Sequence, residues 1–176
     1  MRKILFLQKS DFTFIITEEF LKVRSNIENT PTLLYNVAMK YYTPLKVRTY
    51  ECDSYGHVNN AVYLNYLEYG RMDYLQQIGF DYNGILEAGF YLYVTHVDIH
   101  YKFSAFFNDE LTIETSPIKL GAVTGTIHQR IVKKDGTLCA EADVTWASVS
   151  KDGRPSKIPE NFLVEGLRPD SSDIKS

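Results

Sequence analysis

The most regular hydrophobic pattern in the chain is a helical one between residues 60 and 78. Its apolar positions recur at three- and four-residue spacing and form one face: Tyr63, Leu67, Gly70, Tyr74 and Ile78. Asn59 or Asn60 can cap the free amides where this helix begins. Gly70 lowers helix propensity by about 1 kcal/mol relative to alanine, which predicts that the helix approaches a sheet closely at that point.

Strands are predicted on both sides of this helix. Leu45 to Tyr50 forms a strand before it, and Asp81 to Gly89 forms a short second helix after it. A long alternating strand follows. One of its faces is formed by Tyr91, Tyr93, Thr95, Val97, Ile99, Tyr101 and Phe103, and the other by Val94, His96, Asp98, His100 and Lys102.

Three further strands complete the pattern. They begin near Leu111, Val123 and Leu138, and Asp135-Gly136 is a hairpin turn between the last two. The order is one strand, one long helix and then a four-stranded antiparallel run. This order is typical of an α+β fold in which a sheet packs on one central helix.

The first 38 residues differ from this periodic part. Phe12 to Ile16 is strand-like, Glu18 to Arg24 is weakly helical, and the segment after them is polar. We predict an N-terminal extension over residues 1–38, poorly ordered or a leader, one domain over 39–165 and a C-terminal tail over 166–176. Four acidic residues in the extension argue against a transit peptide, so import into an organelle is the weaker interpretation.

Composition narrows the class of protein. The 176 residues suit one domain, and 44% hydrophobic with 23% charged residues is typical of a globular protein. The net charge of -3 without a basic block argues against a nucleic-acid partner. No apolar run approaches the roughly 18 residues of a membrane-spanning helix. Cys52 and Cys139 are too few for a disulfide framework and lack the CxxC spacing of zinc or redox sites, which favours a reducing compartment. Together with the absence of a long apolar run, this leads us to expect a cytoplasmic protein with no membrane partner.

The candidate chemistry lies between the first strand and the long helix. Asp53 and His57 place a carboxylate and an imidazole directly before a helix N-terminus, where free amides and the helix dipole can stabilise an oxyanion. A carboxylate there can activate water or attack a carbonyl. On composition alone, the competing interpretation is that Asp53 and Asn59 only cap turns and that His57 is a surface loop residue.

Three stretches carry a family resemblance: Val47 to Asp53, Gly56 to Asn60, and Tyr63 to Arg71. They resemble the hotdog-fold thioesterases of the 4-hydroxybenzoyl-CoA thioesterase branch, and the chain is also similar to small plastid acyl-acyl-carrier-protein thioesterases. The similarity runs from about Lys40 to Phe162. It implies a five-stranded antiparallel sheet wrapped around one long helix, and hydrolysis of acyl-CoA or acyl-carrier-protein thioesters without a metal or organic cofactor.

The resemblance also implies roles for single residues. Asp53 matches the catalytic carboxylate, as general base or as nucleophile, and His57 would orient the loop or the water. The backbone amides of Asn59 and Asn60 would polarise the thioester carbonyl. Glu68 matches an acidic position in the helix of many members, and we predict that Tyr55, Tyr63 and Glu68 bind substrate. The larger acyl-carrier-protein thioesterases carry Asn where Tyr55 stands and Glu near Ser104, so the simpler mechanism with a single carboxylate is the one implied here.

Several alternatives stay open at this point. Glu68 can equally pair with Arg71 at i+3. Cys52 adjoins Asp53, but no histidine is evidently placed to activate it, so we interpret it as a plain small residue. His96 and His100 lie on one strand face with Asp98 between them, roughly 13 Å apart, too far to share one metal ion.

The rival functions are a non-catalytic acyl-CoA-binding hotdog sensor and a hotdog hydratase or dehydratase. The sensor would need a DNA-binding helix pair, and the extension offers one weak helix. A lone hotdog sheet has open edges, so we expect a homodimer or homotetramer with the active site near the subunit boundary, where Asp53 faces Tyr91 to Phe103 of a second chain.

Overall fold

The computed structural model describes residues 5–9, 12–16 and 40–169, and the chain divides into two compact units, Met1–Asn36 and Val37–Ser176. In the first unit, β1 (Leu5–Lys9) pairs antiparallel with β2 (Phe12–Ile16), which confirms the strand predicted there. The weak helix predicted at 18–24 lies outside the described residues.

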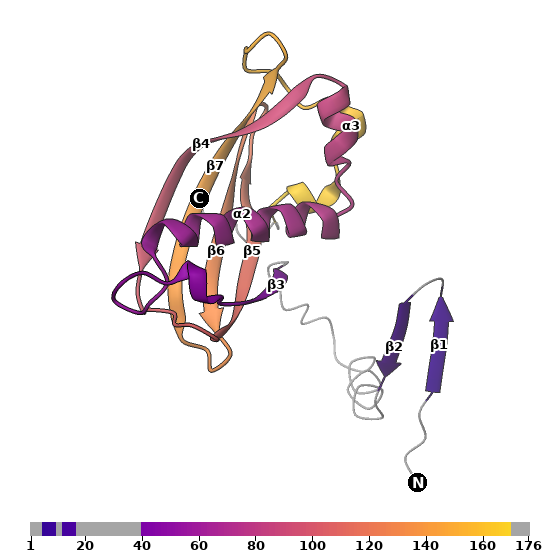
Figure 1. The fold of residues 1–176 in the computed structure, drawn as a ribbon. Coiled ribbons are helices and arrows are strands. Elements are labelled where there is room, and N and C mark those ends of the chain that lie inside the picture. Colours follow the sequence, from indigo (N-terminus) through magenta and orange to yellow (C-terminus); the bar gives the residue numbers. More distant parts are fainter. Residues whose placement is uncertain (1–4, 10–11, 17–39, 170–176) are drawn as a thin grey trace, which may run out of the picture. The chain divides into compact units, whose positions relative to one another are not determined.

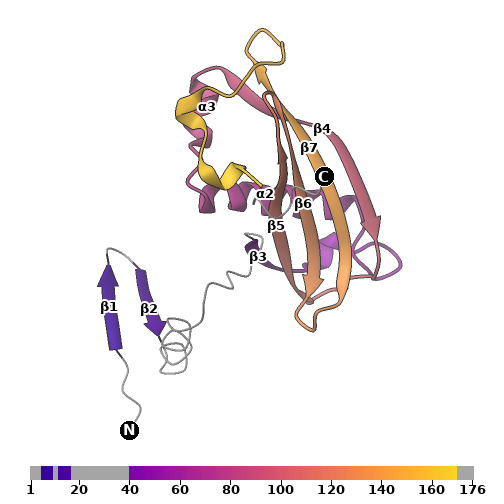
Figure 2. The same cartoon turned by 180° about the vertical axis from the view of Figure 1, so that it is seen from behind.

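The second unit is a five-stranded antiparallel sheet crossed on one face by a long helix (Figures 1 and 2). The strand order is β3-β5-β6-β7-β4, and the antiparallel sheet with one long helix confirms the predicted α+β class. The elements are β3 (Tyr41–Lys46), α2 (Asn60–Gln77), α3 (Tyr82–Glu87), β4 (Phe90–Tyr101), β5 (Glu110–Leu120), β6 (Thr124–Lys133) and β7 (Leu138–Ser150). No helix in the described ranges has the length and apolar character needed to cross a membrane.

The helix α2 matches its predicted start and buried face. Asn59 is the N-cap, and its side-chain oxygen accepts a hydrogen bond from the Ala61 amide at 2.9 Å. The buried positions are Tyr63, Tyr66, Leu67, Gly70, Tyr74 and Leu75. A Cβ at Gly70 would lie 2.6 Å from Cγ2 of Ile113 on β5, so the predicted close approach of helix and sheet is confirmed.

The core consists of two clusters along the helix. The first surrounds Tyr63 and Leu67 and faces Ile113 and Ile131, whereas the second surrounds Tyr74 and Trp146. The second cluster includes Leu167, from a 3-10 turn at Glu165–Leu167. The predicted C-terminal tail, 166–176, therefore begins too early, because burial of the Leu167 side chain extends the packed domain beyond residue 165.

The predicted first strand is misplaced. The strand β3 spans Tyr41–Lys46 rather than Leu45 to Tyr50, and Thr49–Glu51 is a 3-10 turn. Val47 is still buried although it lies beyond the last residue paired in β3. The apolar alternation therefore continues past the end of the strand, which explains the misplaced prediction. The short helix predicted at Asp81 is confirmed, since the Asp81 carboxylate accepts from the Gly84 amide at the start of α3.

The faces predicted for the long strand β4 are correct only in its second half. The pairing with β7 shifts between Val94 and His96, so Thr95 is an extra, unpaired residue. Val97 and Ile99 therefore lie opposite Val144 and Ala142 on the helix side, as predicted. Tyr91 and Tyr93 lie instead on the outer face, opposite Val149 and Ala147, with their rings stacked 5.9 Å apart.

Candidate active site

The loop from Cys52 to Asn59 is held compactly between the 3-10 turn and α2. The Asp53 amide donates to the His57 carbonyl at 2.9 Å, and the Gly56 amide donates to the Asp53 carbonyl at 3.0 Å. Gly56 has a φ of +83°, a conformation that favours glycine. The Val58 amide donates to the Ala105 carbonyl at 2.8 Å and connects the loop to the segment before β5.

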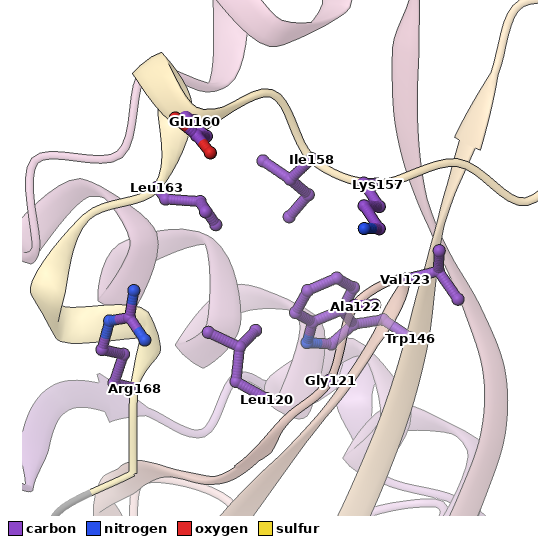
Figure 3. A pocket seen from close by; sticks show the side chains of 10 residues that line it. All are labelled: Leu120, Gly121, Ala122, Val123, Trp146, Lys157, Ile158, Glu160, Leu163 and Arg168. Atoms are coloured by element: carbon purple, nitrogen blue, oxygen red, sulfur yellow. The ribbon is translucent and has the colours of Figure 1, made fainter.

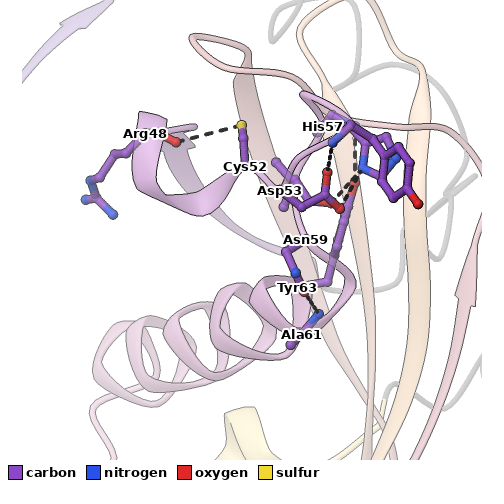
Figure 4. A network of polar contacts seen from close by, with 10 residues as sticks. Arg48, Cys52, Asp53, His57, Asn59, Ala61 and Tyr63 are labelled. Atoms are coloured by element: carbon purple, nitrogen blue, oxygen red, sulfur yellow. Dashed lines mark hydrogen bonds and ion pairs between the residues drawn. The ribbon is translucent and has the colours of Figure 1, made fainter.

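Asp53 and His57, both predicted as catalytic, lie side by side in this loop (Figure 4). Oδ2 of Asp53 is 3.5 Å from Nδ1 of His57, and Oδ1 accepts from the Tyr55 amide at 2.9 Å. Nδ1 of His57 is also 3.3 Å from the Val58 carbonyl oxygen. The Asp53 side chain is only 20% exposed, so its orientation is restricted while one edge still reaches solvent.

The N-terminus of α2 offers one free amide rather than the two predicted. The Asn59 amide donates to the Glu51 carbonyl at 2.9 Å, so it could polarise a substrate, as predicted, only if it left this acceptor. The Ala61 amide is taken by the Asn59 side chain and the Val62 amide by the Asn59 carbonyl. In the described part of the chain, the Asn60 amide has no acceptor, and it stays available to an oxyanion.

The aromatic residues predicted to bind substrate differ in their surroundings. Tyr55 is 83% exposed and stacks on the His57 ring, with centroids 5.9 Å apart. Tyr63 is buried, and its hydroxyl accepts a hydrogen bond from the Ala105 amide at 3.1 Å. Burial raises the pKa of Tyr63 to about 12, so this hydroxyl stays neutral.

Glu68 does not join Asp53 within one chain. It lies eight residues into α2, about 12 Å along the helix from Asn60. Its carboxylate pairs with Arg71, the alternative partner considered from the sequence. Arg71 in turn donates to the side chain of Gln129, which is buried on β6. Burial lowers the pKa of Arg71 while Glu68 opposes that effect, which is consistent with a structural pair.

Sequence reasoning missed the residue that links the loop to the helix, Glu51. Its carboxylate is buried and accepts from the Tyr66 hydroxyl at 2.8 Å and from the Arg48 amide at 2.6 Å. The hydrophobic periodicity does not indicate that Glu51 is buried, because the 3-10 turn at Thr49–Glu51 interrupts the strand pattern. The one available signal is the i+3 spacing of Arg48 and Glu51, which lets the Glu51 carboxylate accept a hydrogen bond from the Arg48 amide across that turn.

The remaining features are the metal-ligating residue types, the Cys52 thiol and a cavity at the other end of the sheet. In the described ranges, no three His, Cys, Asp or Glu side chains are grouped as a metal site would require. The sulfur of Cys52 is 4.0 Å from the Arg48 carbonyl oxygen, its hydrogen-bond acceptor. A cavity of about 250 Å³ opens at the opposite end of β5, over Trp146, with Lys157, Glu160 and Arg168 around it (Figure 3).

Two exposed phenylalanines from the segment before β5 form an aromatic rim beside the loop. Phe106 lies in a β-bridge with His57, and it is about half exposed. The ammonium group of Lys133 sits 5.0 Å from the Phe106 ring centroid, and the same lysine pairs with Asp109. Phe107 is also exposed.

The family model of the thioesterase-like superfamily matches residues 47–165. This stretch is more than half of the chain and includes the candidate loop, α2 and the strands β4 to β7. The chain therefore belongs to the thioesterase-like superfamily. This membership and the relatives below confirm the predicted enzyme class, a thioester hydrolase.

Two relatives show the extent of the similarity. Long-chain acyl-CoA thioesterase FadM of Escherichia coli K12 is 32% identical over 126 residues, which is 71% of this chain and 95% of FadM. The chloroplastic acyl-acyl carrier protein thioesterase ATL2 of Arabidopsis thaliana is 29% identical over 120 residues, 66% of this chain and 63% of ATL2.

Solved structures agree with the fold. A hypothetical protein from Aquifex aeolicus superposes with a TM-score of 0.67 at 26% identity, covering 73% of this chain and 99% of its own. YbaW, a probable thioesterase from Escherichia coli, gives a TM-score of 0.60 at 28% identity, covering 69% of this chain and 92% of its own. The predicted hotdog fold, a five-stranded antiparallel sheet with one long helix, is confirmed.

Proposed function

We propose that the protein hydrolyses acyl-CoA thioesters to a carboxylic acid and CoA, with Asp53 as the catalytic carboxylate. The observation that carries the proposal is the combination of a restrained carboxylate in the loop with the free Asn60 amide at the start of α2. A carboxylate and an oriented N–H donor are what hydrolysis of a thioester requires.

The chemistry follows from this combination. The thioester carbonyl oxygen would point at the Asn60 amide, where the helix N-terminus favours the developing negative charge. Asp53 would then take a proton from the attacking water, or attack the carbonyl itself to form a mixed anhydride that water cleaves. In both routes the C–S bond breaks and the thiolate leaves. His57, 3.5 Å from Asp53, would hold the carboxylate in place.

We choose CoA rather than a carrier protein as the thiol of the proposed substrate because of the relatives that the chain matches. FadM, an acyl-CoA thioesterase, is matched over 95% of its length, whereas ATL2, an acyl-acyl carrier protein thioesterase, is matched over 63%. The aromatic rim formed by Tyr55, Phe106 and Phe107 offers apolar surface for the acyl group.

We also propose that two chains pair through β4. This strand has twelve residues and lies at the edge of the sheet, with β7 as its one neighbour in the described part of the chain. Tyr93, Val94 and Tyr101 on this strand are each about half exposed. Pairing of the two β4 strands would cover this edge and bring Asp53 near the second subunit.

The proposal is tested by thiol release from a panel of thioesters. The panel contains short, long and aromatic acyl-CoA esters, one acyl-carrier-protein thioester, and an oxygen ester with the same acyl group. We expect turnover of at least one acyl-CoA and little turnover of the oxygen ester, because a thiolate is the better leaving group. Turnover of the carrier-protein substrate alone would contradict the choice of CoA, and no turnover of any thioester would contradict the proposal.

A further inference from the structure

Glu51 carries a charged side chain at a buried position, where folded domains rarely keep a carboxylate. The residue is 6% exposed, although it stands only two positions before Asp53. Removal of a carboxylate from water is strongly unfavourable unless several donors compensate it. Oε2 accepts both the Tyr66 hydroxyl and the Arg48 amide, and Oε1 accepts from the Arg48 guanidinium at 3.1 Å.

Not all these donors hold the carboxylate equally. The Arg48 side chain is 63% exposed, so its ion pair with Glu51 is weakened by solvent. Tyr66 is buried in the core, one turn beyond Tyr63 on α2. Burial, followed by the hydrogen bond to Glu51, raises the pKa of Tyr66, so its hydroxyl is a permanent donor to the carboxylate.

The hydrogen bonds of Glu51 enclose the candidate loop. Its side chain bonds to Tyr66 on α2, and its backbone carbonyl accepts the Asn59 amide at the helix cap. Residues 52–58 therefore form a loop whose two ends, Glu51 and Asn59, are hydrogen-bonded to each other. Asp53 and Asn60 are therefore fixed relative to each other by residue 51 as well as by the loop's own hydrogen bonds.

We infer that Glu51, together with Tyr66, is a positioning residue that holds Asp53 at the correct distance from the Asn60 amide. The inference rests on the proposed function for its catalytic consequence. Misplacement of a catalytic group by about 1 Å can cost roughly a hundredfold in rate, so a rigid support explains why a buried carboxylate is kept beside this loop.

The test compares three variants at Glu51 and Tyr66 with a matched control. Glu51→Ala removes the acceptor, Glu51→Gln keeps one oxygen for Tyr66 and the Arg48 amide, and Tyr66→Phe removes only a hydroxyl. Tyr74→Phe is the control, because Tyr74 is equally buried on the same helix and donates instead to the Gly166 carbonyl. All are assayed well below their unfolding temperatures, with folding checked by circular dichroism.

We expect Glu51→Ala to lower kcat roughly 10- to 100-fold and Tyr66→Phe roughly 3- to 10-fold, with KM changed less than about threefold. Glu51→Gln should recover most of the lost kcat, and Tyr74→Phe should match the wild-type enzyme. A role in stability alone predicts equal kcat for Tyr66→Phe and Tyr74→Phe, and that result would overturn the inference. If Glu51→Ala does not fold, the comparison of the two tyrosine variants decides.

Amide hydrogen exchange separates this inference from the proposed function. Residues 53–59 should exchange faster in Tyr66→Phe than in Tyr74→Phe, whatever the substrate of the enzyme. A wild-type protein that hydrolyses no thioester would contradict the proposed function while the exchange result stands. Unchanged exchange at residues 53–59 in Tyr66→Phe would contradict the positioning role even in an active thioesterase.

Discussion

Gly70→Ala gives the sharpest test of how closely α2 approaches the sheet. The added methyl group would lie 2.6 Å from Cγ2 of Ile113 and 3.0 Å from Nε2 of Gln129. Both neighbours are fully buried, so a shift of either one must disturb the core around it. The Gln129 amide also donates to the Leu67 carbonyl at 3.0 Å and to the Thr115 hydroxyl at 3.2 Å.

Two effects of opposite sign compete in this variant. Alanine in place of glycine stabilises a helix by about 1 kcal/mol. Overpacking costs about 1–3 kcal/mol, and a displaced buried amide costs about 1–3 kcal/mol more if it loses its partners. We therefore expect the free energy of unfolding to fall by about 2 kcal/mol in Gly70→Ala.

Urea unfolding at fixed protein concentration measures this change, since an oligomer's stability depends on concentration. Asn65→Ala is the control, because it is an exposed position on the same helix and should gain a few tenths of a kcal/mol. Gly70→Ala combined with Ile113→Ala should cost less than the sum of the two single changes. A Gly70→Ala protein as stable as the wild type would refute the close contact.

Three further predictions concern the chain's boundaries, its cysteines and its assembly. Deletion of residues 1–38 should leave an active enzyme, because the described core is built from residues after them; loss of folding in the truncated protein would place the boundary elsewhere. Burial raises the pKa of Cys139 to about 11, so iodoacetamide at pH 8 should modify Cys52 well before Cys139, as mass spectrometry of the folded protein can check, and Cys52→Ser should stay active. Light scattering should give at least twice the 20.3 kDa subunit mass, and an active monomer would contradict pairing through β4.

The fold could be predicted from the sequence where one period governs a long segment. The three- and four-residue spacing predicted α2 and its buried face, and Gly70 marked the contact with β5. The bulge at Thr95 could not be predicted, because one extra residue leaves alternation intact on each side while it exchanges the faces. As a result, Tyr91 and Tyr93 were predicted on the wrong face of the sheet.

The part of the candidate site that could be predicted is the part formed by residues close together in the sequence. Asp53 and His57 are close neighbours in the chain, so their meeting in one loop follows from the sequence. The sequence does not reveal which backbone amide at the start of α2 stays free. The Asn59 amide donates to the carbonyl of Glu51, eight residues earlier in the chain, and local residue types do not predict that bond. The bond from Tyr66 to Glu51 is equally non-local, and hydrophobic periodicity reports nothing about such bonds.

The central claim is that Asp53 is the catalytic carboxylate, and the most direct test measures kcat/KM for acyl-CoA hydrolysis in Asp53→Asn. Asp135→Asn is the matched control, because the Asp135 carboxylate likewise accepts the amide two residues ahead at 2.9 Å and lies in an exposed turn. Loss of a general base typically costs about a hundredfold, so we predict at least that loss in Asp53→Asn and wild-type turnover in Asp135→Asn. Hydrolysis by Asp53→Asn at the wild-type rate would contradict the assignment.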